Sequence, residues 1–168
     1  MTRLDYCNSV LAGAPRSATD KLHRVQNAAA RVVSGTRKFD RGLSRLLHVD
    51  LHWLDVPECV QYKLGVTVRR CQQHKHKTPQ YLINCVTPAS DIASRQRLRS
   101  ASRYQLLVPR YRLSSLGRRS FAVAGPMTWN SLSADLRDPT CSDESFRRSL
   151  KTFLFANNNN NNNNNRFV

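Results

Sequence analysis

The residues of this chain best suited to chemistry are eight arginines between Arg95 and Arg119. No acidic residue lies between Asp91 and Asp135, so this positive block repels itself unless another group neutralises it. Phosphate is the natural counterion, because the guanidinium fork is always charged and binds phosphate oxygens two at a time. We predict that the arginines contact nucleic-acid phosphates and that two tyrosines stack on bases. The predicted contact residues are Arg97, Arg99, Arg103, Arg110, Arg112, Arg118, Arg119, Tyr104 and Tyr111.

Large apolar residues are interleaved with these arginines, from Leu98 to Trp129. This alternation favours a packed element with one cationic face over a disordered basic tail. Trp129 lies beside Pro126 and Leu132 and is predicted to belong to the core. The alternative interpretation of the block is a solvated basic surface that binds nothing, and charge alone does not separate the two.

The whole chain is strongly basic. Its 168 residues carry 27 Lys and Arg against 11 Asp and Glu, which gives a net charge of +16. This balance predicts an anionic partner, and nucleic acid is the simplest one. Phospholipid headgroups compete with it, but no apolar run approaches the ~20 residues of a membrane span, and no secretory signal is evident. We therefore expect an intracellular protein, nuclear or cytoplasmic, without a membrane partner.

The other reactive side chains form no catalytic or metal-binding pattern. Cys71, His74 and His76 lie close together and Cys85 follows, but this spacing matches no structural zinc site. The five cysteines include no CxxC pair, which indicates reduced thiols rather than a disulfide framework. The acidic residues are scattered, whereas a two-metal polymerase or nuclease needs convergent carboxylates. We predict no enzyme activity, no metal site and no cofactor.

Three segments are predicted to form the main helices. The first is capped by Ser17 or Thr19 and ends at Gly35, with one apolar stripe formed by Leu22, Val25, Ala29 and Val32. The second starts at Asp55 with Pro57 in its first turn, and its wide apolar arc predicts a central position. The third is capped by Thr140 or Ser142, and its apolar face comprises Phe146, Leu150, Phe153 and Leu154.

Shorter elements are predicted between these helices. Residues 43–49 and 81–86 are expected to form short helices, and residues 87–90 a linker before the arginine block. Residues 106–111 suggest a short strand at a sheet edge, because Pro109 cannot donate to a central ladder. Residues 121–132 are compatible with a helix, although Gly125 and Pro126 would kink or start it. The asparagine run 157–165 cannot bury apolar surface and is predicted to be disordered.

Seven short motifs occur along the chain in a characteristic order. They are Leu4–Ser9, Val25–Arg31, Leu51–Leu54, Arg97–Ser100, Pro109–Arg112, Gly117–Phe121 and Pro126–Leu132. In this order they resemble the downstream part of LINE-type, non-LTR retrotransposon reverse transcriptases, most closely the chicken-repeat and jockey-like group. Each motif is weak by itself, but seven in one order are specific. Copies of that family usually have proline at the positions of Asp55 and Ser133, so these departures indicate a drifting copy.

The resemblance implies a region downstream of the palm. The polymerase aspartates of the family, including the Tyr-x-Asp-Asp pair, lie upstream of the first motif, and no Asp-Asp pair occurs here. The implied organisation is a thumb-like helical segment over 1–90, a basic C-terminal segment over 91–156 packed on it, and a disordered poly-Asn tail over 157–168. The predicted fold is therefore mainly α, with at most a small β-hairpin. In the parent enzyme such a region would grip template RNA or the RNA–DNA hybrid.

We therefore expect a non-catalytic nucleic-acid-binding fragment of a retrotransposon reverse transcriptase. Its implied partners are RNA or an RNA–DNA hybrid, bound by the phosphate backbone, and the palm domain of the parent enzyme. One alternative is a non-functional translated remnant of a decayed element, whose basic face once packed against that palm domain. Another is a standalone basic structural protein of a ribonucleoprotein.

Overall fold

The computed structural model describes residues 8–112 and 117–164. The Leu4–Cys7 part of the first motif and residues 165–168 of the predicted tail lie outside the described residues. The described chain is mainly helical, which confirms the predicted fold class. Its α-helices are α1 (Arg16–Ser34), α2 (Leu43–Arg45), α3 (Val56–Gln73), α4 (Gln80–Ile83), α5 (Arg99–Ser102), α6 (Phe121–Ser131) and α7 (Asp143–Asn164). Single helical turns are η2 (Asn8–Leu11), η3 (Leu46–Asp50), η4 (Lys75–Lys77), η5 (Ala89–Asp91), η6 (Ala93–Arg95), η7 (Gly117–Arg119) and η8 (Asp135–Arg137).

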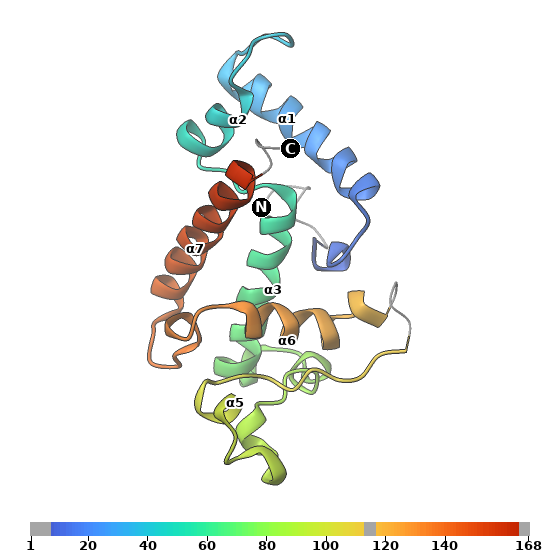
Figure 1. Ribbon diagram of the computed structural model, residues 1–168, viewed down its shortest axis with the longest axis vertical. Helices are drawn as coiled ribbons and strands as arrows, with labels where there is room; N and C mark the ends of the chain where they lie inside the picture. The colour runs from blue at the N-terminus through green and yellow to red at the C-terminus, as the bar shows by residue number, and fades with distance from the viewer. Residues whose placement is uncertain (1–7, 113–116, 165–168) are drawn as a thin grey trace.

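The long helix α3 runs through the centre of the molecule (Figure 1). It begins after Asp55, with Pro57 in its first turn, as the sequence predicts. Helix α7 lies alongside it and α6 crosses it, while α1 and α2 lie near its N-terminal end and α5 near its opposite end (Figure 1). The predicted central position of this helix is therefore confirmed.

One core joins the predicted thumb-like segment to the predicted basic segment. Its fully buried side chains include Val68 of α3, Trp129 of α6 and Phe146, Leu150 and Leu154 of α7, each at most 1% exposed. A smaller cluster joins Val60 and Leu64 of α3 to Ala12 and Ala124. Residues 91–156 thus supply much of the apolar surface that covers α3, and the two segments share a single interior.

Helix α1 forms as predicted but faces the core differently. Gly35 ends it in the left-handed conformation at φ 68°, whereas Pro15 stands at the start and no side chain caps the first turn. The predicted stripe faces the core only in part: Leu22 and Ala29 are half-buried, whereas Val25 is 51% exposed and Val32 is 83% exposed. The buried side chains are Gln26 and Ala30, and Gln26 Nε2 donates to the Leu54 carbonyl at 2.6 Å. This distant hydrogen bond satisfies the amide nitrogen of Gln26, while its buried Oε1 has no partner among the described residues, and it holds the rotation of the helix.

The small β-hairpin does not form in the described residues. Only one antiparallel bridge is present, between Pro88 and Leu106, and beyond Leu107 the segment continues as extended chain without a partner strand. The predicted linker 87–90 is part of this bridge, because Leu107 N donates to the Thr87 carbonyl and Ala89 N to the Gln105 carbonyl. Ala89 is 2% exposed, so this stretch belongs to the packed structure. Pro88 and Pro109 lack amide donors and prevent the ladder from extending.

Helix α6 spans residues 121–131 in spite of the Gly125-Pro126 pair. Both residues are buried, and a Cβ at Gly125 would lie 3.1 Å from Val68 of α3. The glycine therefore allows α6 to cross α3 closely, and packing stabilises a helix that the proline alone would weaken. Trp129 is 1% exposed and its indole Nε1 donates to the Tyr104 carbonyl at 2.9 Å, which confirms its predicted place in the core.

Helix α7 starts at the predicted position, since Ser142 Oγ accepts a hydrogen bond from Ser145 N. Its predicted apolar face is confirmed, with Phe153 only partly buried at the edge of the core. The backbone continues as helix to Asn164, where the sequence predicts a disordered tail. Extending an existing helix adds one hydrogen bond per residue without a new nucleus, so asparagines of modest helix propensity can follow the packed turns.

Replacing Trp129 by alanine should destabilise the fold by about 3–5 kcal/mol, because it leaves a large cavity and an unpaired Tyr104 carbonyl. Phe39→Ala is the matched control: this ring is 88% exposed, and its loss should change stability by less than about 0.5 kcal/mol. Urea unfolding followed by circular dichroism measures both. Equal stability of the two variants would contradict a core role for the indole.

Candidate nucleic-acid interface

The seven predicted arginines lie in three groups along one stretch of chain, which we name the arginine strip. Arg97, Arg99 and Arg103 lie in and beside α5; Arg110 and Arg112 lie in the extended chain after Leu107; Arg118 and Arg119 form η7. Six of the seven side chains are exposed, and Arg119 is half-buried. The extended chain leads from α5 along α6 toward η7 (Figure 1). The structure therefore spreads the predicted arginines along an edge rather than gathering them in one cluster.

The arginines of the strip have no carboxylate partners in the part of the chain that the structure describes. The ion pairs found there join His48 to Asp55, Arg69 and His74 to Asp143, and Arg148 to Glu144. An exposed guanidinium without an internal counterion keeps all of its donors for an external anion. The strip thus has the solvent access and the charge that phosphate contacts require.

The two predicted stacking residues are partly exposed at either end of the extended chain. Tyr104 is 51% exposed and adopts a left-handed backbone conformation at φ 53°. Tyr111 is 40% exposed and packs so closely against Gly117 that a Cβ at position 117 would meet it at 3.1 Å. Both rings therefore keep a solvent-accessible surface, which base stacking needs.

Neutral contacts hold the strip against the core. The Asn130 amide forms two hydrogen bonds to the backbone of Leu106: its Oδ1 accepts from the amide at 2.8 Å, and its Nδ2 donates to the carbonyl at 2.9 Å. Leu106 itself is 4% exposed. Since the backbone is fixed by Asn130 and by the Trp129 indole, the charged side chains are not needed to stabilise it.

Sequence reasoning missed a charged anchor beneath this surface. Arg69 is 2% exposed; it donates to the carbonyls of Asp138 and Cys141, and its guanidinium lies 4.7 Å from the Phe146 ring centre. Its Nε is 3.7 Å from Asp143 Oδ1, and the other Asp143 oxygen accepts from His74 Nε2 at 2.7 Å. The sequence offered only a weak signal, the position of Arg69 within the apolar arc of the central helix next to Arg70.

The environment of Asp143 stabilises its charged form. The hydrogen bond from His74 lowers the pKa of this carboxyl, and the nearby charges of His74, Arg69 and Arg147 act in the same direction against partial burial. The carboxylate therefore stays ionised at neutral pH and serves as a counterion for the buried Arg69 guanidinium. This contact joins the C-terminal half of α3 to the start of α7.

Cys71, His74, His76 and Cys85, which the sequence places close together, do not converge on a metal site. His74 is hydrogen-bonded to Asp143. Burial, and to a smaller extent the neighbouring Cys85, raises the pKa of the Cys71 thiol to about 11. Among residues 8–112 and 117–164, no three His, Cys, Asp or Glu side chains are placed to hold a metal ion. No helix in that part of the chain is long and apolar enough to cross a bilayer.

No protein-family model, curated protein or solved structure matches this chain. The retrotransposon resemblance therefore remains a prediction that rests on the seven motifs. The exposure of the strip and the contacts that hold it are independent of that resemblance.

Replacing Asp143 by asparagine should destabilise the protein by about 1–3 kcal/mol at pH 7, because the buried guanidinium loses its counterion. Since folding lowers the Asp143 pKa, its contribution is present above the unfolded value of about 3.9 and is lost as pH falls through the lower folded value. The difference in unfolding free energy between wild type and variant should therefore decrease below about pH 4. Urea unfolding at pH 7 and pH 3 tests this.

Glu144→Gln is the matched control, because this neighbouring carboxylate is 87% exposed and pairs only with the exposed Arg148. It should change stability by less than about 0.5 kcal/mol at either pH. If Asp143→Asn behaves like Glu144→Gln, the Arg69 guanidinium is compensated by its carbonyl contacts alone.

Proposed function

We propose that this chain is a non-catalytic nucleic-acid-binding fragment of a LINE-type reverse transcriptase. It binds the phosphate backbone of RNA or an RNA–DNA hybrid through the arginine strip, and it acts inside the cell, in the nucleus or cytoplasm. The observation that carries the proposal is the exposure of six arginines that have no carboxylate partner in the described chain. Tyr104 and Tyr111 then stack on bases beside the strip.

The arrangement of the strip supports an extended ligand. Three groups of arginines follow one another along the chain, so a strand laid along this edge can meet them in succession (Figure 1). Phosphate contacts fix position without reading bases, and side-chain stacking tolerates any base. The proposed binding is therefore independent of sequence and strongly dependent on salt.

A second role, docking to the palm domain of the parent enzyme, is favoured by the outer face of α1. Val25, Val32 and Val33 of this helix are 51%, 83% and 64% exposed, and Phe39 just beyond it is 88% exposed. Exposed apolar side chains at helical spacing are typical of a surface that another domain covers. This face lies on α1, whereas the arginine strip lies on α5, η7 and the extended chain, so the two roles do not compete for the same residues.

Neutralising Arg110 and Arg112 together, as Arg110→Gln and Arg112→Gln, should weaken binding to all nucleic-acid sequences about equally. The log–log salt slope should fall by about 0.7–0.9 per lost contact, because each neutralised phosphate releases condensed counterions. Both side chains are exposed on extended chain, so the fold should be retained. Fluorescence anisotropy across a salt titration, with single-stranded RNA and with an RNA–DNA hybrid, measures affinity and slope.

The matched control is Arg37→Gln with Arg41→Gln, which removes the same charge from the exposed turn between α1 and α2. It should retain most of the affinity and the wild-type slope, and deleting 157–165 should change neither. If the folded strip variant keeps wild-type affinity and slope, the arginines face a protein partner and the nucleic-acid proposal fails.

The purified chain should show no primer extension and no nuclease activity with Mg²⁺ or Mn²⁺. The physical reason is the scattered distribution of its carboxylates, which cannot hold two metal ions 3.5–4 Å apart, the spacing of two-metal sites in general. Incorporation of labelled nucleotides on a primed RNA template measures this. Metal-dependent extension that one aspartate substitution abolishes would contradict it.

A further inference from the structure

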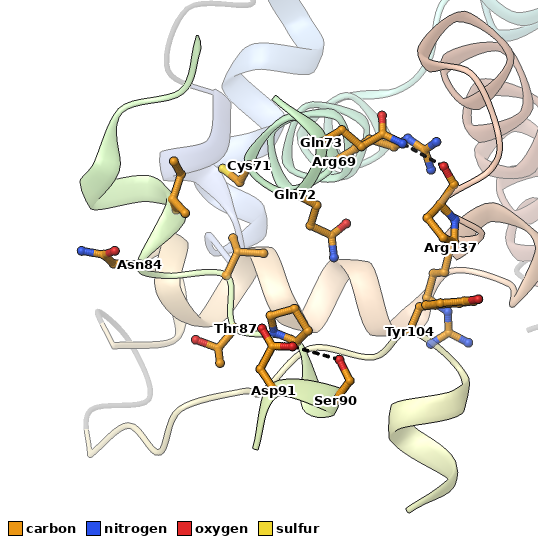
Figure 2. A pocket seen from close by; sticks show the side chains of 14 residues that line it. Arg69, Cys71, Gln72, Gln73, Asn84, Thr87, Ser90, Asp91, Tyr104 and Arg137 are labelled. Carbon is orange, nitrogen blue, oxygen red and sulfur yellow. Dashed lines mark hydrogen bonds between the residues drawn. The ribbon is translucent and has the colours of Figure 1, made fainter. Parts of the chain in front are cut away.

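A groove of about 540 Å³ lies between α3, α4, the 87–91 turn and Arg137. Arg137 and Tyr104 stand at one end of it, Asn84 and Thr87 lie at the other, and the Gln72 amide points into the space between (Figure 2). Its volume falls within the range of about 300–1,000 Å³ that is typical of small-molecule sites. The lining combines amide, hydroxyl and guanidinium groups with apolar walls.

Two buried arginines line this groove, and only one of them has a counterion. Arg69 faces Asp143 and the ring of Phe146. Arg137 is 6% exposed, and no carboxylate of the described chain forms an ion pair with it. Among the described residues its one hydrogen bond runs from Nη1 to the Asn130 carbonyl at 3.4 Å, and its buried Nε finds no partner there. Arg137 is therefore a buried cation with most of its donors unused.

Such a side chain is costly unless an anion compensates for it. Taking a charge out of water is unfavourable, and an unpaired buried cation destabilises a fold more than a paired one. Burial and the neighbouring charge of Arg103 both lower the pKa of Arg137, so the protein disfavours this cation rather than stabilising it. A bound anion at this end of the groove would remove both penalties.

We propose that the groove binds a single nucleotide, with its phosphate held by Arg137 and Arg103. The planar guanidinium of Arg137 offers paired donors that match two phosphate oxygens, and exposed Arg103 supplies a second positive charge. Gln72 and Asn84 provide amide donors and acceptors for a base edge, and the Tyr104 ring provides a stacking surface. Asp91, farther along the lining, accepts a hydrogen bond from the Ser90 hydroxyl, and its carboxylate disfavours a second anion there.

A nucleotide is favoured over other anions because Tyr104 lines the groove and directly follows Arg103 of the strip, whose charge acts on Arg137. A strand bound along the strip as far as Arg103 would therefore end beside Tyr104, at the Arg137 end of the groove. The choice of a nucleotide rather than another phosphate compound rests on the proposed function, whereas the anion site itself rests on Arg137.

The test is isothermal titration of the full chain with adenosine 5′-monophosphate, adenosine, inorganic phosphate and acetate. The nucleotide should bind at least tenfold more tightly than each of the other three. Arg137→Met should reduce nucleotide affinity at least tenfold while the fold is retained, since replacing an uncompensated buried charge by an apolar side chain is often neutral or stabilising. Arg118→Met, which removes an exposed arginine outside the lining, is the matched control and should retain wild-type affinity.

Equal affinity for the nucleotide and for phosphate or acetate would overturn the proposal, and so would unchanged nucleotide affinity in folded Arg137→Met. If that variant unfolds, exposed Arg103→Gln is measured instead, with a several-fold loss expected and unchanged affinity overturning the proposal. The salt titration of the strip separates the two ideas. If strand binding depends on salt as expected but the single nucleotide does not bind, only the groove proposal fails. If the nucleotide binds but no salt-dependent complex with a nucleic-acid strand forms, only the strip proposal fails.

Discussion

The close approach of α6 and α7 to the central helix α3 is the constraint on which the rest of the structure depends. A Cβ at Gly65 would lie 3.1 Å from Leu150 of α7, and a Cβ at Gly125 of α6 would lie 3.1 Å from Val68 of α3. The two glycines lower helix propensity, but they allow Leu150 and Val68 to be completely buried. A larger side chain at either position would separate the helices and leave poorly filled space between them.

Around this apolar centre, a small number of buried polar groups decides the course of the connecting chain. Arg69 binds the carbonyls of Asp138 and Cys141, so it fixes the turn between η8 and α7 as well as the start of α7. Gln26 performs a similar task at the other end of α3 by binding the Leu54 carbonyl before the helix begins. Because an unsatisfied buried polar group is costly, each of these contacts selects one arrangement among many that bury similar apolar area.

The arginine strip is separate from the forces that stabilise the fold. Its backbone is held by the Asn130 amide and the Trp129 indole, whereas six of its seven arginine side chains are exposed and Arg119 is half-buried. Substitutions of the exposed arginines in the strip should therefore leave the fold intact.

Local sequence determined the existence of the main helices and several of their ends. Helix ends are marked by Pro57 in the first turn of α3, by the left-handed backbone of Gly35 and by the Ser142 hydroxyl that caps α7, and each of these acts on nearby residues. The spacing of Phe146, Leu150 and Leu154 also predicted the inner face of α7, because its polar residues leave one apolar side. Exposure of the predicted arginines follows from the high cost of burying a charge.

Tertiary structure decided what depends on distant partners. The rotation of α1 was mispredicted because the helix has two candidate inner faces, one with the valines and one with Gln26 and Ala30. The hydrogen bond from Gln26 to the Leu54 carbonyl, 28 positions away, selects the second face. Residues 106–111 are of strand-forming types, but Pro88 on one chain segment and Pro109 on the other cannot donate backbone hydrogen bonds. The pairing is therefore limited to one bridge with residues 87–89. The burial of Arg69 and Arg137 had no reliable local signal, because whether a guanidinium is compensated depends on carbonyls, rings and carboxylates that only folding brings to it.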